Sequence, residues 1–485
     1  MAVKLSSHFY ALTSITFLLI NCYFLTSNYA YSASIAVIDS GIDIRHEKIS
    51  TQVWIDSLDN ETNGQTGVDE DNDGFIDDIH GWNFVDNNNQ LIDSKYLTQF
   101  NSEHEKFFEI QIKFLDNSYI QDDIVWLKEK YKDPKFMSEI ASMGNFIHGT
   151  HVAGICAEKS TTNKIQTLKI IPTEAKLKNK NLKSNASSGD EIYQDYLEGI
   201  NQGLKELPLV KYVLHGIAKR QMEGMVEIVS YVNFHKIDIA NGSFGTGFKD
   251  AKRICESIGR AVLERDTTDN ELAEIATYFL THVLSYGQNT FEKAPNTLFV
   301  FAAGNDNSNN DILPSSPTNV KADNTIAVAA TFAQKDLANF SNYGAKMVDV
   351  AAPGVGIMSS VPNNKYLGLS GTSQAAPYVS NIAAQIKNTN PKLGPKDIKE
   401  ILIKTVDVKN FLRGKVASSG IVNKDRAIKA AQISKNTSLS LANAIAQAQL
   451  EIKDAKSTIS DSQYKRALLY QNLQYIMPLQ NGFNF

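Results

Sequence analysis

Three short segments of the chain place a side chain of catalytic type beside a turn or a run of small residues. Asp39 ends the apolar run at 34–38, His148 opens the segment His-Gly-Thr-His-Val-Ala-Gly, and Ser373 lies within the segment 370–377. A hydroxyl becomes an effective nucleophile near neutral pH when an imidazole takes its proton, and a carboxylate can hold that imidazole in the correct tautomer. A serine at the start of a helix also places its own amide N–H beside its hydroxyl, which provides half of an oxyanion hole.

Each segment has an ordinary structural interpretation as well. Asp39 could be a turn aspartate satisfied by backbone N–H groups, and His148 could be a buried histidine of the core. His148 and His151 are spaced for one face of a helix, which would permit metal binding. No glutamate of the His-Glu-x-x-His kind accompanies them, so the sequence disfavours zinc. We expect a helix of small residues to begin directly after His148.

Taken together, the three segments resemble the sequence motifs of the subtilisin-like serine proteases, or subtilases. The motifs of that family occur in the chain order Asp, His, Ser, which is the order in this sequence. The resemblance implies that Asp39 is the orienting carboxylate, His148 the general base and Ser373 the nucleophile. His151 matches a second histidine of the family motif, and the resemblance implies that it is a packed structural residue.

Two further stretches resemble the family's substrate-contacting segments. Residues 300–305 are similar to its oxyanion-hole segment, which implies that the Asn305 side chain donates to the oxyanion; taken alone, Asn305 could merely cap a bend. Residues 241–245 are similar to the strand-edge segment that pairs with substrate. With interruptions, the resemblance covers residues 34–431. The substrate-binding residues that it implies are Ser243, Phe244, Gly245, Ala303 and Gly304.

The resemblance implies an exported serine endopeptidase that hydrolyses the peptide bonds of a polypeptide substrate through an acyl-enzyme and requires no cofactor for catalysis. Two alternatives belong to other functional classes. A catalytically silent subtilase-fold binding or scaffold protein is disfavoured because all four implied catalytic residues are present. A calcium-dependent adhesion protein rests on an acidic segment alone. Many secreted subtilases carry a pro-domain that assists folding; we expect none before Ser34, so either folding needs no assistance or the segment 95–140 or the tail provides it.

The acidic segment at 56–88 repeats aspartate at every second position ahead of Gly74. Calcium loops of the EF-hand type place carboxylates at this spacing and add a backbone carbonyl and another acidic side chain downstream. His80 stands where an EF-hand has its bidentate glutamate, so the segment is not a full EF-hand loop. It predicts either a structural calcium site or a solvated acidic loop. The candidate ligands are Asp69, Asp71, Asp73, the carbonyl of Phe75 and Asp77.

The N-terminal segment has the three-part layout of a secretory signal. Lys4 precedes an apolar run at 9–25, and small residues follow near Ala30. We predict a signal peptide at 1–30 and hence a secreted, periplasmic or cell-surface protein. The alternative is a retained signal anchor, which is the one case in which we expect contact with a membrane.

The composition bounds the class of protein and its partners. The chain of 485 residues is 42% hydrophobic and 21% charged, which excludes wholesale disorder, collagen and a long coiled coil. The formal net charge of −5 gives no overall basic character, so we expect no nucleic-acid partner. Beyond the signal segment, Cys156 and Cys255 either pair in an oxidising compartment or are two buried apolar side chains. The oligomeric state stays open.

The elements that must position these side chains alternate along the chain. Short apolar runs, typical of strands buried on both faces, occur at 34–38, 167–171, 237–240, 297–303, 325–330 and 347–351. Helical patterns lie between them, for example at 254–264 and 272–286. This alternation predicts an α/β fold with a mainly parallel central sheet flanked by helices, and the resemblance implies the subtilisin-like version of it over 34–431. Insertions near 56–88, 95–140 and 173–190 and a helical C-terminal tail at 435–485 complete the expected organisation.

Overall fold

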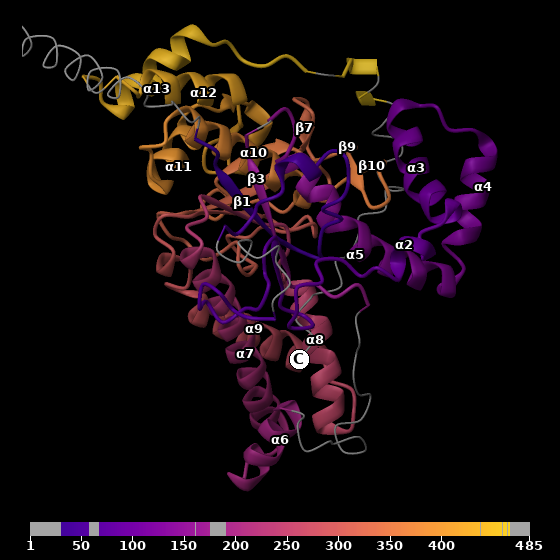
Figure 1. Ribbon diagram of the computed structural model, residues 1–485. Coiled ribbons are helices and arrows are strands. Elements are labelled where there is room, and N and C mark those ends of the chain that lie inside the picture. The colour runs from indigo at the N-terminus through magenta and orange to yellow at the C-terminus, as the bar shows by residue number, and fades with distance from the viewer. Residues whose placement is uncertain are drawn as a thin grey trace, which may run out of the picture. The chain divides into compact units, whose positions relative to one another are not determined.

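The apolar runs form a central sheet in the computed structural model, whose described residues are 31–57, 67–160, 162–174, 191–436, 438–457, 459–462 and 464–465. Its strands are β1 (Ser34–Asp39), β2 (Gly81–Asn83), β3 (Lys164–Lys169), β4 (Ile239–Gly242), β5 (Leu298–Ala302), β6 (Thr325–Phe332), β7 (Asp336–Leu337), β8 (Val350–Pro353), β11 (Asp407–Val408) and β12 (Gly420–Ile421). They lie in the order β11-β12-β8-β6-β5-β4-β1-β3-β2, with β7 paired to β6 (Figure 1). The β11–β12 and β6–β7 pairs are antiparallel, and the other pairs of this sheet are parallel. The predicted α/β fold with a mainly parallel sheet is confirmed.

Several predicted segments lie wholly or partly outside the described residues. These are the signal segment 1–30, residues 58–66 of the acidic insertion, the insertion at 173–190 from 175 onward, and the tail from 466 onward. The elements described here belong to one compact unit that begins at Ser32. Within the described part of the chain, none of the helices combines the length and the apolar character needed to cross a bilayer.

Some strands are displaced from the apolar runs that predicted them. β3 begins earlier than expected, at Lys164, because that residue pairs with Ser34 at the start of β1. β4 continues to Gly242, because Asn241 and Gly242 pair with β5 although neither is apolar. Partner strands therefore decide where these strands end, and hydropathy alone does not.

The strand order of the sheet reverses at β1. β3 lies on one side of β1 and β4 on the other, with Asp39 opposite Lys169 and Ile38 opposite Gly242. In parallel α/β sheets, a crevice forms beyond the carboxyl ends of the strands where the strand order reverses. The residues that follow β1, β4 and β5 are thus gathered at one edge of the sheet.

Helices cover both faces of the sheet. One face carries α5 (Pro134–Cys156), α10 (Thr372–Thr389), α11 (Pro395–Lys404), α12 (Lys424–Ile433) and α13 (Leu441–Glu451), and the other carries α6 (Glu191–Asn201), α7 (Glu206–Phe234), α8 (Phe248–Leu263) and α9 (Asp269–Gly287). Alternate side chains of β1 point to opposite faces: Ile35 and Val37 pack with the first group, and Ala36 and Ile38 with the second. β1 is therefore buried on both sides, as its continuous apolar sequence predicts.

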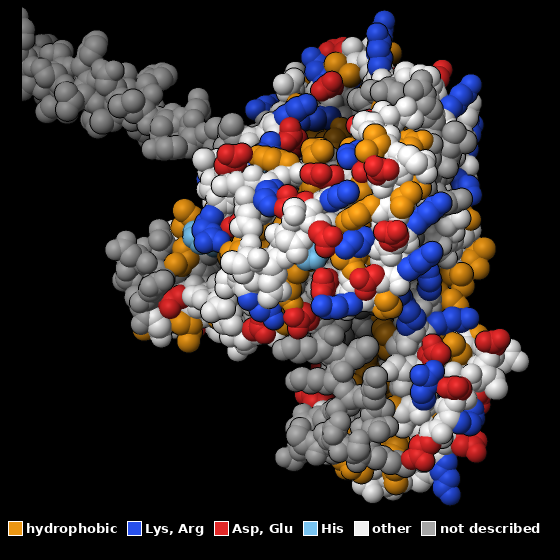
Figure 2. Space-filling view, turned by 90° about the vertical axis from the view of Figure 1, so that its right-hand side faces the viewer, with side chains coloured by type: hydrophobic (Ala, Val, Ile, Leu, Met, Phe, Trp, Pro, Cys, Tyr) orange, Lys and Arg blue, Asp and Glu red, His pale blue; other side chains and the backbone are white. Residues whose placement is uncertain are grey.

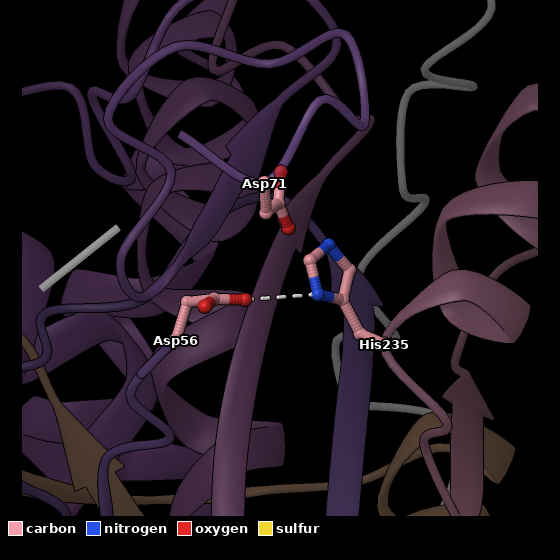
Figure 3. A group of neighbouring side chains, drawn as sticks. All are labelled: Asp56, Asp71 and His235. Atoms are coloured by element: carbon pink, nitrogen blue, oxygen red, sulfur yellow. Dashed lines mark ion pairs between the residues drawn. The ribbon is translucent and has the colours of Figure 1, made fainter. Parts of the chain in front are cut away.

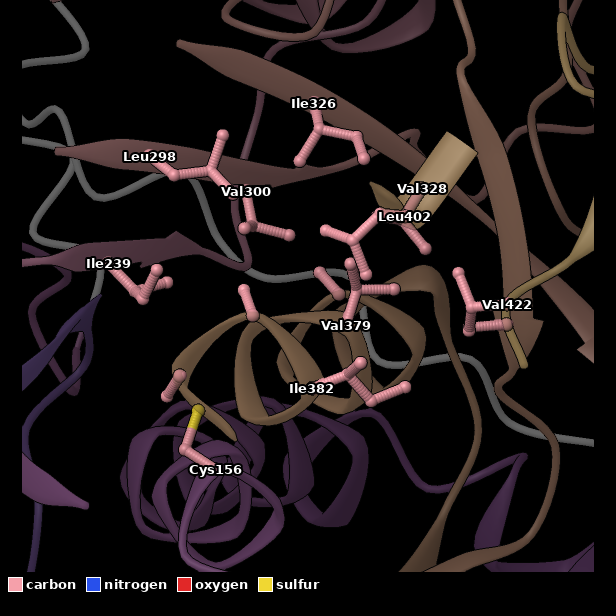
Figure 4. Close-up of a cluster of buried hydrophobic side chains, with 14 of the residues drawn as sticks. Cys156, Ile239, Leu298, Val300, Ile326, Val328, Val379, Ile382, Leu402 and Val422 are labelled. Atoms are coloured by element: carbon pink, nitrogen blue, oxygen red, sulfur yellow. The ribbon is translucent and has the colours of Figure 1, made fainter. Parts of the chain in front are cut away.

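The two cysteines of the described chain belong to different apolar clusters. Cys156 ends α5 and points toward α10, in the same apolar cluster as Val379 and Ile382 (Figure 4). Cys255 lies in α8, on the opposite face of the sheet. Both are buried and free, and burial raises the pKa of the Cys255 thiol to about 12. They are two buried apolar side chains and do not form a disulfide.

The insertion near 95–140 is helical. It consists of α2 (Tyr96–Gln99), α3 (Ser102–Asp116), α4 (Gln121–Lys130) and the first half of α5 (Figure 1). Its apolar side chains form a separate cluster that also takes in the hairpin of β9 (Ile357–Val361) and β10 (Lys365–Leu369). On the face shown in Figure 2, Lys and Arg side chains are interspersed with Asp and Glu side chains.

One expectation about the helix that carries His148 was wrong. α5 does not begin after His148; it begins at Pro134 and runs for 23 residues. Asp133 caps it by accepting from the backbone N–H groups of Lys135 and Phe136, and proline fits the first helical position because it needs no N–H donor there. The last part of the helical insertion and the segment around His148 therefore belong to one continuous helix.

Candidate active site

Asp39 and His148 form a buried hydrogen-bonded pair at the carboxyl end of β1. The Nδ1 atom of His148 lies 2.7 Å from Oδ1 of Asp39, and both side chains are 1% exposed. The same oxygen accepts from the backbone N–H of Ser40 at 2.7 Å. A carboxylate oxygen can only accept, so Nδ1 carries the proton and Nε2 is left to accept one. This is the tautomer that a general base toward a hydroxyl requires.

The backbone around the pair is packed at close range. Ser40 accepts a hydrogen bond from the N–H of Gly149 at 3.0 Å through its Oγ. A side chain at Gly149 would place its Cβ 2.3 Å from the backbone oxygen of Gly41. Only glycine permits this approach of α5 to the end of β1, and the approach brings His148 within reach of Asp39.

Ser373 lies in the first turn of α10 and is 6% exposed. Its hydroxyl donates to the backbone oxygen of Ser243 at 3.1 Å, and the hydroxyl of Ser243 donates to the backbone oxygen of Ser373 at 3.0 Å. Among the described residues, the Ser373 hydroxyl makes no hydrogen bond to His148. Rotation about its Cα–Cβ bond would be needed to direct it to an acceptor other than Ser243.

Asn305 is held in one orientation by the residue that precedes Ser373. Its Oδ1 accepts from both the backbone N–H and the hydroxyl of Thr372, each at 2.9 Å. Thr372 in turn accepts from the N–H of Gly304 at 3.2 Å through the same hydroxyl. Because the side-chain oxygen is occupied, the Nδ2 amide group of Asn305 is the part left to donate, and it lies beside Gly371.

The substrate-binding residues implied by the resemblance follow two adjacent strands. Ser243, Phe244 and Gly245 come after β4, and Ala303 and Gly304 come after β5, which pairs with β4. A pocket adjoins this edge, and it is lined by Gln221, Met222, Met225, Phe244, Gly245, Thr246, Ser316 and Pro317. The structure thus places the two predicted segments side by side.

Two other residues of the motifs, His151 and Gln374, have buried side chains. His151 donates from Nε2 to the backbone oxygens of Ile357 and Leu367, both at 3.0 Å, in the β9–β10 hairpin. Burial lowers its pKa to about 3, so the ring is neutral. Gln374, next to Ser373, is 1% exposed, and its Nε2 has no hydrogen-bond acceptor among the described residues.

The acidic loop brings together part of the predicted calcium ligand set. Carboxylate oxygens of Asp69, Asp71 and Asp73 lie within 4.8 Å of one another. Asp77 instead accepts from the backbone N–H of Gly67 at 3.1 Å and belongs to none of the groups in which the described carboxylates converge. Burial, and then the charge of Asp73, raise the pKa of Asp71 to about 6, and its Oδ2 is buried with no hydrogen-bond partner among the described residues.

A histidine that sequence analysis did not single out lies against this loop. The Nδ1 of His235 is 3.0 Å from Asp56 (Figure 3). Its Nε2 is 2.9 Å from Asp73, and both contacts are hydrogen bonds only when both ring nitrogens carry protons. The carboxylate of Asp71 points toward the same ring (Figure 3). His235 directly follows α7, and its distance along the chain from Asp56 and Asp73 gave no local signal.

Comparison with known proteins agrees with this geometry. The model of the subtilase family matches residues 31–427. Subtilisin-like protease 1 of Plasmodium berghei (strain Anka) is 26% identical over 417 residues, which are 85% of this chain and 52% of that protein. Alkaline elastase YaB of Bacillus sp. (strain YaB) is 37% identical over 149 residues, which are 30% of this chain and 37% of that protein.

Among solved structures, a cold-adapted subtilisin-like serine proteinase aligns with 82% of this chain and 89% of its own, at 18% identity and a TM-score of 0.38. The chain spans about half the length of the Plasmodium relatives that it matches. The family match covers most of the chain and includes all the motif residues described above. The chain therefore belongs to the subtilase family.

Proposed function

We propose that this protein is a serine endopeptidase that hydrolyses peptide bonds through an acyl-enzyme. The observation that carries the proposal is the buried hydrogen bond between His148 and Asp39 at the sheet edge where Ser373 and Asn305 also lie. Family membership supports the same activity. The substrate is a polypeptide, and the chain acts outside the cytoplasm, as the signal-like segment at 1–30 indicates.

The reaction begins when the Ser373 hydroxyl leaves the Ser243 carbonyl and attacks the carbonyl carbon of the substrate. His148 takes the hydroxyl proton on Nε2, and Asp39 stabilises the resulting imidazolium through Nδ1. The negative charge that develops on the substrate oxygen is stabilised by the Nδ2 amide of Asn305 and the backbone N–H of Ser373.

The tetrahedral intermediate then collapses. The C–N bond breaks, and the proton on His148 passes to the departing amine. A water molecule repeats the attack on the acyl-enzyme, again with His148 as base, and releases the carboxylic acid product and free Ser373. No cofactor takes part in these steps.

Labelling with a fluorophosphonate probe tests this proposal and separates it from a catalytically silent subtilase-fold protein. We expect the wild-type protein to be labelled at Ser373 and to cleave a peptide library. Ser373→Ala should abolish both while the protein remains folded. Ser230→Ala, which changes an exposed serine of α7, is the matched control and should be labelled normally. Full peptide hydrolysis by the Ser373→Ala protein would contradict the assignment.

We also propose a structural calcium ion at the acidic loop, held by oxygens of Asp69, Asp71 and Asp73. The fit rests on the convergence of these carboxylates and on the Oδ2 of Asp71, which is buried and has no hydrogen-bond partner in the described part of the chain. Calcium favours all-oxygen ligand sets, so His235 is expected to support the loop and not to bind the ion. A bound cation would neutralise the crowded carboxylates and stabilise the fold.

Thermal melting tests the calcium proposal. A ligand present at about 100 times its Kd stabilises a protein by about 2.7 kcal/mol, so EDTA should lower the Tm measurably. Asp71→Asn should abolish this response, and Asp122→Asn, an exposed change in α4, should leave it intact. An unchanged Tm in EDTA would count against the ion. A larger stabilisation by Zn²⁺ than by Ca²⁺ would instead indicate a mixed site that includes His235.

A further inference from the structure

Lys169 is a buried cation next to the proposed catalytic pair, and the mechanism described above does not use it. It ends β3 directly opposite Asp39, and it is 2% exposed. Within the described part of the chain, no carboxylate lies within ion-pair distance of its ammonium group. Burying a charged group without a partner costs several kcal/mol, so the position of this side chain calls for a physical explanation.

The ammonium group is fixed by two backbone oxygens. Lys169 donates from Nζ to Ser40 at 2.9 Å and to Ile171 at 3.1 Å. Ser40 bonds to both elements that carry the proposed pair. Its backbone N–H donates to Asp39 at the end of β1, and its hydroxyl accepts from the N–H of Gly149 in α5. Lys169 therefore anchors a residue that bonds both to the Asp39 carboxylate and to the helix carrying His148.

The charge of the ammonium group also acts on the pair. Burial lowers the pKa of Lys169, whereas the charges of Asp93, Asp86 and Asp39 raise it, so Asp39 is one of the carboxylates that stabilise the charged form. The second oxygen of Asp39, Oδ2, is buried and accepts no hydrogen bond from the described residues. A nearby cation compensates an oxygen that lacks a donor, since attraction between opposite charges is strong in a site with little water.

We propose that Lys169 is a positioning residue: it holds the Ser40 backbone in place and so keeps the Asp39 carboxylate oriented as the acceptor for His148. Two other titratable groups interact with the pair: His151 on α5, which is neutral, and the buried Cys156 thiol. Neither can supply a positive charge. The proposal rests on the proposed function for its kinetic consequences, and the geometry of the pair can be observed independently of catalysis.

The test compares Lys169→Met, Lys169→Gln and the control Lys164→Met. Lys164 begins the same strand with a half-buried side chain and touches neither Ser40 nor Asp39. We expect Lys169→Met to lower kcat by at least about tenfold with KM within about twofold. The acid limb of kcat/KM should move to higher pH by about half a unit, because the repulsion between the ammonium and the imidazolium of His148 is lost.

Lys169→Gln keeps side-chain N–H donors near Ser40 while removing the charge, and it guards against a failure of the methionine variant to fold. It should show the same displacement of the acid limb with a smaller loss of kcat. The NMR signal of the His148 Nδ1 proton, recorded on the Ser373→Ala background, should change in both Lys169 variants and not in Lys164→Met. This signal remains informative even if the protein proves inactive on peptides.

Two results would overturn the proposal. One is a folded Lys169 variant with the wild-type kcat, pH profile and His148 signal. The other is a loss of activity that parallels a loss of Tm while the acid limb and the His148 signal stay unchanged, which would make Lys169 a residue of the fold alone.

Discussion

Thr372 fixes the side chain of Asn305 through two hydrogen bonds. The backbone N–H and the hydroxyl of Thr372 both donate to Oδ1 of Asn305, each at 2.9 Å. The amide nitrogen of Asn305 is therefore oriented before any substrate arrives. Asn305→Asp keeps the acceptor for Thr372 and removes the donor, whereas Asn305→Leu removes both. Loss of one oxyanion donor costs about 2.7–4 kcal/mol, so both variants should lose roughly 10²–10³-fold in kcat with little change in KM.

Steady-state kinetics and thermal melting on the same preparations separate catalysis from folding at this position. The Tm should fall in Asn305→Leu and stay near that of the wild type in Asn305→Asp. Asn307→Asp, an exposed change two residues further along the chain, provides the control and should leave kcat unaltered. An Asn305→Asp protein with wild-type kcat would contradict the proposed role of Asn305 as an oxyanion donor.

Gly149→Ala should damage both stability and activity. The added Cβ would meet the backbone oxygen of Gly41 at 2.3 Å, and backbone cannot give way as a flexible side chain can. We expect a loss of about 1–3 kcal/mol in the free energy of unfolding, together with a displacement of His148 from Asp39. Denaturant unfolding and kcat measure the two effects.

Gly224→Ala is the matched control for that change. Gly224 also lies within a helix, α7, but a Cβ there would meet nothing within 4 Å. Alanine should stabilise this helix by about 0.5–1 kcal/mol, because glycine is a poor helix former. If both alanine variants behaved alike, the close contact at Gly149 would not be the cause of the loss.

His151 makes stability depend on pH. The pKa of its ring is about 3 in the folded protein, below the ordinary value of 6.5. Between these two pH values the unfolded chain therefore binds one proton more than the folded protein does. The contribution of His151 to stability is complete above pH 6.5 and is lost as the pH falls toward 3, with a slope of up to about 1.4 kcal/mol per pH unit. His151→Gln, whose amide can still donate to Ile357 and Leu367, should unfold with a shallower dependence on pH over this range. Identical slopes for the two proteins would contradict the buried neutral ring.

Gln374→Met should stabilise the fold. The Nε2 amide of Gln374 is buried without an acceptor among the described residues, and a buried donor that makes no hydrogen bond costs about 1–3 kcal/mol. Methionine has a similar length and carries no such group. The Tm should rise while kcat stays within about twofold of the wild type. A lower Tm would show that the amide has a partner, such as an ordered water.

The residues of the proposed site lie where sequence patterns change. Asp39 and Asn305 each follow an apolar run, and Ser373 follows a turn and precedes small residues. Each segment alone also had an ordinary structural interpretation, and only their combination and chain order led to the resemblance that singled them out. Lys169 left a visible signal too, since it is a charged residue within an apolar run. Which backbone oxygens receive its ammonium group depends on the pairing of β3 with β1, which no local pattern encodes.

Other features depended on packing between distant segments. The start of α5 was missed because the glycines near His148 weaken a helical pattern that Asp133 and Pro134 begin well upstream. His235 joins the acidic loop only because the end of α7 lies beside it in the folded chain. Asp77 matched the spacing of a calcium loop, but its carboxylate accepts from the backbone N–H of Gly67 and does not belong to the group of converging carboxylates.

The continuous α5 helix has a consequence for the energetics of the whole molecule. Its first half is embedded in the apolar cluster of the helical insertion, and its second half carries His148 and the contact of His151 with the β9–β10 hairpin. A helix shared in this way does not let one region open while the other stays closed. The insertion and the segment around His148 should therefore form a single cooperative unit, with amide protons that exchange together along the helix.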